Sequence, residues 1–444
     1  MPDIKQNLLA DREWVATFYP PDRKDLAFAG TLTYSPTSGL HLRYAIPVDW
    51  VPAEPARFLH GLTSDGERCT LVGEFAPARY GGFSYKNGMH CYRGRKSFRY
   101  FVLGLHCDDQ STFDSFDFTL SGTENFFGHP DFRRRSELPD EPLYSAKIGA
   151  GKLELRWSGS LDFGSDDLTS LFHDPDTESM AKLQSAYAEI RESKPNFRPY
   201  YKKQVDYSFR LRPTEDLLIK PAHQICQGLA NLFSLLLFTP VLFKELYVIA
   251  RDESDRPYQM AVFPASIAEK DTLQRASQAV DQLLIPLTID DIDFEKALQA
   301  WEVVQDDYPT LISRVQSQGM VVASHAVLAG IVLSATQLED IGHQANRKGD
   351  KYQFPIERYA SDSLKGHLAS LLSCEPECIG ERISELRNEI AHVGRPKKNL
   401  ANLNARQRHQ IELALEVVAI TYVLEKIHVT PAAREKYQRA VLRA

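Results

Sequence analysis

The first part of the chain, up to about residue 210, alternates apolar and polar positions in short runs that end at turn residues. A two-residue period places every second side chain on one face of an extended segment, as in half-buried β-strands. The runs are also rich in β-branched and aromatic residues, which suit a pleated surface. They predict strands at residues 28–34, 40–46, 70–75, 98–105, 116–120, 153–157 and 204–211. We expect a sandwich or barrel-like β-rich domain here.

The pattern changes at Pro213, from which apolar residues follow a helical spacing as far as Thr239-Pro240. We expect one helix in this stretch, closing the β-rich domain, and then two more strands at 244–250 and 258–263. From about residue 267 the helical period dominates, which predicts an all-α bundle. Its helices are expected at residues 294–304, 308–317, 321–346, 356–372, 379–393 and 406–427.

These patterns predict an α+β multidomain protein with three segments. Residues 1–212 form the β-rich domain, 213–290 complete it or link it onward, and 291–444 form the all-α domain. A chain of 444 residues that is 43% hydrophobic and 25% charged fits two or three globular domains, and excludes disordered, collagen-like and coiled-coil classes. The most apolar stretches, 228–243 and 320–335, are too short to span a bilayer and indicate buried helices.

The charge is distributed unevenly along the chain. The formal net charge is −7 and the isoelectric point about 6.0, which excludes a protein that binds nucleic acid over its whole surface. Residues 379–444, however, contain twelve Lys/Arg and seven Asp/Glu, so this stretch carries +5 and the rest of the chain −12. A chance fluctuation of surface charge and a local polyanion site both explain such an asymmetry.

The six cysteines are sparse, and no secretory leader is evident at the start of the sequence. We therefore expect reduced thiols and a cytoplasmic protein. The chain has no P-loop, no complete G-x-G-x-x-G and no H-E-x-x-H motif.

Three groups of potential metal ligands are better explained by local structure. Cys374 and Cys378 form a single pair with no second pair to complete a zinc site. The acidic run from Asp290 to Glu295 has the carboxylates of a divalent-metal site, but Thr288 with Asp291 fits a helix-capping signature. The segment 106–109, His-Cys-Asp-Asp, is interpreted as a polar strand end.

The segment 379–398 combines a packing stripe with a polar face. Ile379, Ile383, Leu386, Ile390 and Val393 recur at helical spacing, so this stripe faces a core. A different face is shared by Ser384, Asn388 and His392, and the stop signals Gly394 and Pro396 place His392 in the last helical turn.

A histidine at the end of a helix is suited to proton transfer, because the negative end of the helix dipole favours the imidazolium. Arg387 lies one turn earlier, and its guanidinium can hold phosphate oxygens through two donors. No acidic residue interrupts the basic residues that follow until Glu412, so we expect them to bind RNA phosphates: Arg395, Lys397, Lys398, Arg406 and Arg408.

Two parts of the chain resemble known families. Arg387-Asn388-x-x-x-His392 resembles the R-N-x-x-x-H signature of HEPN domains, which are commonly metal-independent ribonucleases. The N-terminal part is similar to the β-rich N-terminal domain of ApeA-type anti-phage defence proteins. Three stretches carry this second resemblance: 28–32 (FAGTL), 70–75 (TLVGEF) and 118–126 (FTLSGTENF).

The resemblance implies a homodimer in which two copies of Arg387, Asn388 and His392 build one RNA-cleaving cleft, with no cofactor and no metal. It implies attack by the RNA 2′-hydroxyl on the adjacent phosphate, in single-stranded or looped RNA such as tRNA. It also implies an abortive-infection role in which the N-terminal domain senses a phage-derived activator, without a membrane partner. The alternatives are a catalytically silent HEPN module for dimerisation or RNA binding, and an unrelated helical protein with a chance motif.

Overall fold

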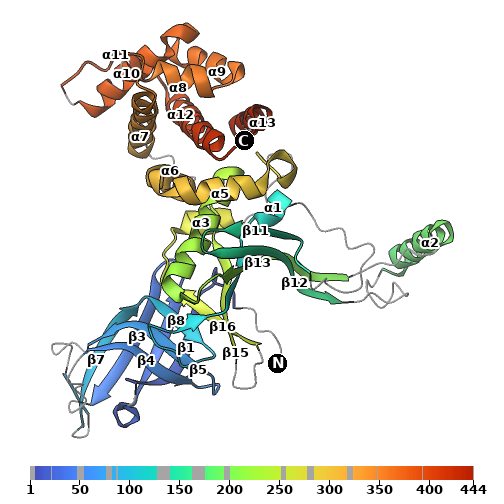
Figure 1. The fold of residues 1–444 in the computed structure, drawn as a ribbon, viewed down its shortest axis with the longest axis vertical. Coiled ribbons are helices and arrows are strands. Elements are labelled where there is room, and N and C mark those ends of the chain that lie inside the picture. Colours follow the sequence, from blue (N-terminus) through green and yellow to red (C-terminus); the bar gives the residue numbers. More distant parts are fainter. Residues whose placement is uncertain are drawn as a thin grey trace.

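The fold of the chain is known from a computed structural model (Figure 1). It describes residues 6–21, 23–47, 55–76, 83–86, 89–127, 141–162, 176–194, 201–251, 257–277, 285–317, 324–347, 349–392 and 394–443. The expected α+β architecture is confirmed, with antiparallel strands in the N-terminal part and helices in the C-terminal part.

The strands are as follows: β1 Arg12–Tyr19, β2 Phe28–Ser35, β3 Gly39–Pro47, β4 Ala56–Thr63, β5 Arg68–Phe75, β6 Phe83–Lys86, β7 Met89–Phe98, β8 Tyr100–Leu103, β9 Thr112–Phe113, β10 Ser115–Leu120, β11 Tyr144–Ile148, β12 Gly151–Asp162, β13 Tyr201–Pro213, β14 Leu217–Leu218, β15 Phe243–Arg251 and β16 Pro257–Pro264. Within the described ranges, fourteen of them form one sheet, in the order β11-β12-β13-β10-β15-β16-β8-β5-β4-β1-β2-β3-β7-β6. The short strands β9 and β14 pair separately.

One half of the large sheet closes on itself as a barrel. Strands β7 and β8 are two parts of one extended segment, interrupted at Arg99, whose N–H donates to Val72 O (2.9 Å). β7 pairs with β3 and β8 pairs with β5, while β5, β4, β1, β2 and β3 are successive neighbours. The bent segment therefore joins the two ends of this row. The interior is so tightly packed that a Cβ at Gly61 would lie 2.8 Å from a ring carbon of Phe18.

The other half of the sheet is covered by helix α3 (Ile219–Leu237). The predicted strands at 244–250 and 258–263 are confirmed as β15 and β16, which lie in the middle of the sheet between β10 and β8. Phe233 of α3 packs on Phe209 of β13 at a ring distance of 5.6 Å and on Phe294 of the following helical region at 5.7 Å. α3 therefore shares an aromatic core with both regions.

The start predicted for this helix was wrong. β13 continues to Pro213 and β14 occupies Leu217–Leu218, so α3 begins at Ile219, six residues later than expected. The segment is extended because Pro213 pairs with Gly151 of β12, and Leu217 and Leu218 pair with β9. The predicted end is close to the observed one, because Phe238 adopts a left-handed conformation with φ 50° and ends the helix.

The helices are as follows: α1 Thr123–Phe127, α2 Thr177–Ser193, α4 Lys270–Ala276, α5 Phe294–Val304, α6 Pro309–Ser317, α7 Ser324–Gln344, α8 Gln353–Tyr359, α9 Asp362–Leu372, α10 Ile379–Ala391, α11 Lys398–Ala401, α12 Ala405–Lys426 and α13 Pro431–Arg443. Among them α12 is central, packed against α7, α8, α9 and α13. No helix in the described part of the chain has the length and apolar character needed to cross a membrane. The exposed helix α2, which projects from the sheet in Figure 1, was not predicted.

One predicted helix is two helices. The apolar spacing over 356–372 suggested a single element, but α8 ends at Tyr359 and α9 starts at Asp362. Ala360 is extended, and the Ser361 side chain accepts a hydrogen bond from the Leu364 N–H (3.3 Å). A serine N-cap thus restarts the helix in a new direction.

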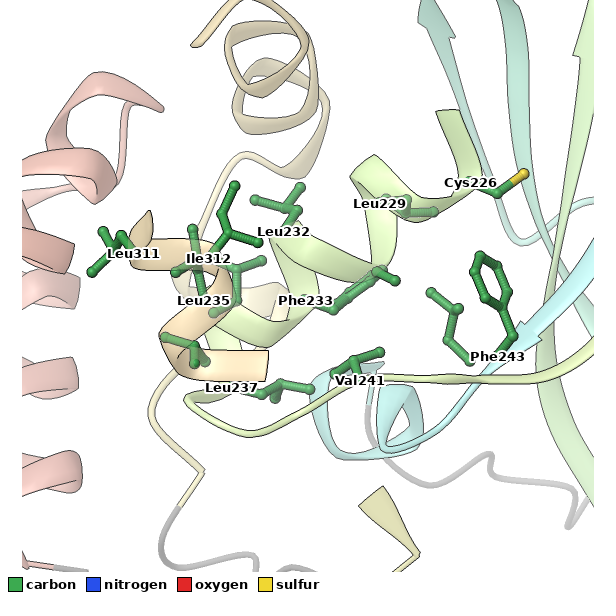
Figure 2. Packing of buried hydrophobic residues seen from close by; sticks show 14 of the residues in the cluster. Cys226, Leu229, Leu232, Phe233, Leu235, Leu237, Val241, Phe243, Leu311 and Ile312 are labelled. Carbon is green, nitrogen blue, oxygen red and sulfur yellow. The ribbon is translucent and has the colours of Figure 1, made fainter. Parts of the chain in front are cut away.

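Helix α3 also holds the C-terminal helices to the sheet (Figure 2). Trp301 of α5 donates from Nε1 to Gly228 O (2.8 Å), and the fully buried Tyr437 of α13 donates from its hydroxyl to Leu235 O (2.7 Å). Since Leu235 is in the last turn of α3, its carbonyl has no partner within the helix. A boundary between domains at residue 290 stays a prediction, and α5 beyond it packs against both α3 and β11.

We expect Tyr437→Phe to reduce the free energy of unfolding by about 1–2 kcal/mol, because a buried helix carbonyl loses its partner. Urea unfolding followed by circular dichroism measures this. Tyr19→Phe is the matched control, since the Tyr19 hydroxyl makes no hydrogen bond with the described residues and its loss should change stability by less than about 0.5 kcal/mol. Equal effects of the two substitutions would contradict this role of Tyr437.

Candidate functional site

The candidate site lies on α10, which is anchored in the helical core by its predicted stripe. Ile379, Ile383 and Leu386 are fully buried, and Ile390 is partly buried against them. Val393, the last residue predicted for the stripe, lies outside the described residues. The helix contacts α7, α8 and α9, so its direction is fixed from three sides. The first turn is also held, because the N–H of Gly380 donates to Gln353 Oε1 (2.7 Å).

Arg387 and Asn388 are adjacent on α10 and are hydrogen-bonded to each other. Arg387 Nη1 donates to Asn388 Oδ1 (3.3 Å), and both side chains are half-buried. The Nε of Arg387 is buried without a hydrogen-bond partner among the described residues. The guanidinium is therefore partly desolvated, and such a group gains more from an anionic ligand than a fully hydrated one does.

An acidic residue of α7 that the sequence pattern does not reveal, Glu339, interacts electrostatically with Arg387. Glu339 on α7 accepts hydrogen bonds from Lys351 Nζ and from the Tyr352 hydroxyl (2.7 Å). The bond from Lys351 is the main cause that lowers the pKa of Glu339, although burial opposes it, and the Tyr352 bond and the positive charge of Arg387 also lower it. Burial, followed by the bond to Glu339, raises the pKa of Tyr352 to about 12. Glu339 is thus an ionised carboxylate that is hydrogen-bonded to Lys351 and Tyr352 and lies within electrostatic range of Arg387.

No sequence signal identified Glu339, because a glutamate on a helix is most often a solvated surface residue. Its importance arises from the packing of α7 against α10, which are distant in the sequence.

His392 lies at the very end of α10. It was expected in the last helical turn, and it is the C-cap residue, with an extended backbone at φ −114° and ψ 121°. Its N–H still donates to Asn388 O (3.1 Å), so the last hydrogen bond of the helix is kept. Its side chain is exposed, and within the described residues its ring makes no hydrogen bond. The imidazole is therefore open to a ligand at the end of α10.

A second missed residue, Glu389, fixes the segment after the helix. It is only 7% exposed and accepts hydrogen bonds from the N–H groups of Asn399 (3.0 Å) and Leu400 (2.9 Å) and from Asn399 Nδ2 (2.9 Å). Glu389 lies on a different side of α10 from Asn388 and His392, so the polar face that predicts the site does not include it. A detectable signal was its spacing of three from Leu386 and six from Ile383, which places it at the edge of the buried stripe.

The five predicted RNA-binding residues fall into two groups. Arg395, Lys398 and Arg406 are exposed. Lys397 Nζ donates to Glu389 O and to His392 O (3.1 Å), and Arg408 Nη2 donates to Leu400 O (3.0 Å). Lys397 thus caps the carbonyl end of α10 and Arg408 holds the following segment. The structure brings Lys397 next to His392.

The other sequence candidates have structural roles. Thr288 and Asp291 form the expected capping box at the short helix η4 (Ile289–Asp291), and Asp291 pairs with Lys436 Nζ (2.6 Å). His106 Nε2 donates to Gly61 O (2.9 Å) at the end of the barrel, where its ring stacks on His60 at 4.6 Å. Over the described ranges, no three His, Cys, Asp or Glu side chains gather as a metal site, and Cys374 and Cys378 are free thiols.

Comparison with known proteins places most of the chain in one family. A family model described as ApeA N-terminal domain 1 matches residues 13–301. The match spans the whole sheet, α3 and most of α5, and it ends before α6 and the helices that carry the candidate site. No match to this chain is found among curated proteins or solved structures.

We expect Glu389→Ala to release the segment 397–400 and to cost about 1.5–3 kcal/mol, because several hydrogen bonds to a buried charge are lost. Amide hydrogen exchange at Asn399 and Leu400 should accelerate. Glu381→Ala, an exposed position on the same helix, serves as the control and should leave these amides protected. Unchanged protection in the Glu389 variant would show that the contact contributes nothing.

The hydrogen bonds of Glu389 also predict that the free energy of unfolding depends on pH. Burial raises the pKa of Glu389, but the hydrogen bonds from Leu400 and Asn399 outweigh burial, so its pKa lies below the ordinary value. A carboxylate with a depressed pKa stabilises the fold above its ordinary pKa, and this stabilisation disappears as the pH falls through the folded-state value. Urea midpoints at neutral and mildly acidic pH should therefore differ more for the wild type than for Glu389→Gln.

Proposed function

Since this chain belongs to the ApeA N-terminal domain 1 family, we propose that it is an anti-phage defence protein whose C-terminal helices form a HEPN endoribonuclease. The observation that carries the nuclease assignment is the arrangement of α10. The helix presents Arg387 and Asn388 as a hydrogen-bonded pair and ends at an exposed His392. A cation, an amide and an imidazole on one helix end are what a phosphate-cleaving site requires.

The proposed reaction is attack of an RNA 2′-hydroxyl on the adjacent phosphate. A His392 imidazole takes the hydroxyl proton, the 2′ oxygen bonds to phosphorus, and the bond from phosphorus to the 5′ oxygen breaks. An imidazolium gives a proton to the departing oxygen, so the products are a cyclic 2′,3′-phosphate and a 5′-hydroxyl. Arg387 stabilises the charge that develops on the phosphoryl oxygens, and Asn388 orients either the guanidinium or a phosphate oxygen.

One protomer supplies one His392, whereas the reaction needs a base and an acid on opposite sides of phosphorus. We therefore propose that two α10 helices meet across a homodimer, as the resemblance to HEPN domains implies. Glu339 acts as a positioning residue in this site. Its negative charge acts on Arg387 from α7, and we propose that this attraction orients the guanidinium toward a bound phosphate.

The substrate is RNA that is single-stranded or looped, such as tRNA loops, because an A-form helix does not allow in-line attack by its own 2′-hydroxyl. The exposed Arg395, Lys398 and Arg406 are placed to bind phosphates beside the cleavage site. The acidic N-terminal part is better suited to regulation than to RNA binding, and we propose that it responds to a phage-derived activator.

We expect His392→Ala and Arg387→Ala each to reduce RNA cleavage by at least about a hundredfold, because each removes a group that acts only in the transition state. Purified proteins are incubated with total cellular RNA, and new 5′-hydroxyl ends are counted. His343→Ala is the control, since His343 is an exposed histidine at the end of another helix of the same bundle, and should cleave like the wild type. Undiminished cleavage by either α10 variant would overturn the assignment.

If no protein cleaves RNA, lysate from phage-infected cells is added. Cleavage by the wild type alone then indicates a missing activator. If the wild type still does not cleave RNA but binds it, the result indicates the alternative function, a HEPN module that only dimerises or binds RNA.

We also expect excess EDTA to leave cleavage unchanged, because proton transfer by His392 and charge stabilisation by Arg387 require no metal. Rates with EDTA and with added Mg²⁺ are compared on the same RNA. A strict requirement for Mg²⁺ would instead direct attention to the carboxylates between Asp290 and Glu295.

A further inference from the structure

A cavity of about 420 Å³ lies where the barrel, α3, α4 and α6 meet, and the described residues that line it include none from α10. Its walls come from segments far apart in the sequence, including Leu8 near the N-terminus, Tyr34 of β2, Phe243 of β15 and Ser313 of α6. A volume in this range is typical of pockets that hold small organic molecules, roughly 300–1,000 Å³. Neither the sheet nor the proposed nuclease reaction needs such a space.

The walls of the cavity are mainly apolar, and the side chains of Tyr34 and Gln316 in them are already hydrogen-bonded. The Tyr34 hydroxyl donates to Leu8 O (2.8 Å). The side-chain amide of Gln316 donates to Asn231 Oδ1 (3.2 Å) and accepts from the Val241 N–H (3.1 Å). Because most of the wall is apolar and these polar groups are engaged with each other, the cavity favours a ligand with an apolar body over sugars and nucleotides.

The cavity also has a single charge at its rim. Among its described lining residues, Glu269 is the only one that is charged at neutral pH, and no Lys, Arg or His balances it. Glu269 precedes α4 but its side chain does not cap that helix, and in the described part of the chain it has no ion-pair partner. Ile267, which is 68% exposed, lies beside it. An apolar cavity with one free carboxylate at its opening matches a cation rather than an anion.

We propose that this cavity binds a small organic amine, an apolar molecule with one cationic group that meets Glu269. The apolar body replaces water along Leu8, Phe243 and Ile267, and the charged end stays at the exposed rim, where its desolvation costs little.

A ligand in this cavity contacts a helix, α6, that is connected to the helices of the candidate site. Helix α6 contributes Ser313 and Gln316 to the wall, while its Leu311 and Ile312 are buried, with Figure 2 placing Ile312 beside Leu232 of α3. The same helix contacts α12 and precedes α7, which carries Glu339 within electrostatic range of Arg387. Binding does not depend on the nuclease assignment, whereas any effect of binding on RNA cleavage rests on the proposed function.

The test uses the full chain and fluorescence titration with dansylcadaverine, an apolar fluorophore with a primary amine. An uncharged dansyl analogue of equal length and one ending in a carboxylate are titrated beside it. We expect saturable binding, with the amine preferred over the carboxylate by about fivefold, as one exposed ionic contact allows. Glu269→Gln should abolish this preference, while Glu74→Gln, an exposed glutamate on the barrel, should retain it.

A second variant, Ala268→Trp, fills the cavity and should abolish binding of all three probes, with circular dichroism confirming that it folds. Absence of saturable binding to the wild type, or binding unaffected by both variants, would overturn the proposal. Equal affinity of the wild type for the three probes would overturn the assignment of an amine. Binding is read without RNA, so failure of the nuclease prediction leaves this result intact.

Discussion

The structure depends on one buried helix that belongs to two cores. In its second half, from Gly228 to Leu237, α3 is buried at every position but Asn231. One face packs on the open half of the sheet through Phe233, and the other receives Trp301 and Tyr437 from the C-terminal helices. A helical segment that is apolar on more than one face is stable only when each of those faces is covered. The sheet and the helical bundle therefore cannot separate without exposing the core of both.

Whereas α3 is largely buried, the candidate site has exposed reactive groups on a rigid support. α10 is held by three fully buried aliphatic residues, and the segment after it is held by the buried carboxylate of Glu389. The half-buried Arg387 and the exposed His392 project from this support without being part of it. Such placement fixes the positions of the reactive groups while their chemistry stays open to a ligand. Glu339 adds a charge from a second helix and thereby ties the state of Arg387 to the packing of α7.

The local spacing of apolar residues was sufficient to predict most helices and strands. It failed where contacts between distant segments favour another conformation. The spacing over residues 294–304 predicted α5, whose bounds are Phe294–Val304. Residues 213–218 have a helix-like opening, but Pro213 pairs with β12 and Leu217–Leu218 pair with β9, so the extended conformation is preferred. Residues 356–372 look continuous because α8 and α9 both keep their apolar side chains toward the core. The direction changes only at Ser361, where a single side chain caps the new helix.

The sequence by itself determined the fold class, the packing stripe of α10 and the grouping of Arg387, Asn388 and His392, because these rest on residues a few positions apart whose geometry a helix sets. Only the tertiary structure decided which distant groups surround them. It placed Glu339 by Arg387 and Leu400 on Glu389, and it left a cavity between the barrel and α6. Contacts of this kind arise when separate elements pack, and one-dimensional spacing carries no information about which surfaces will meet.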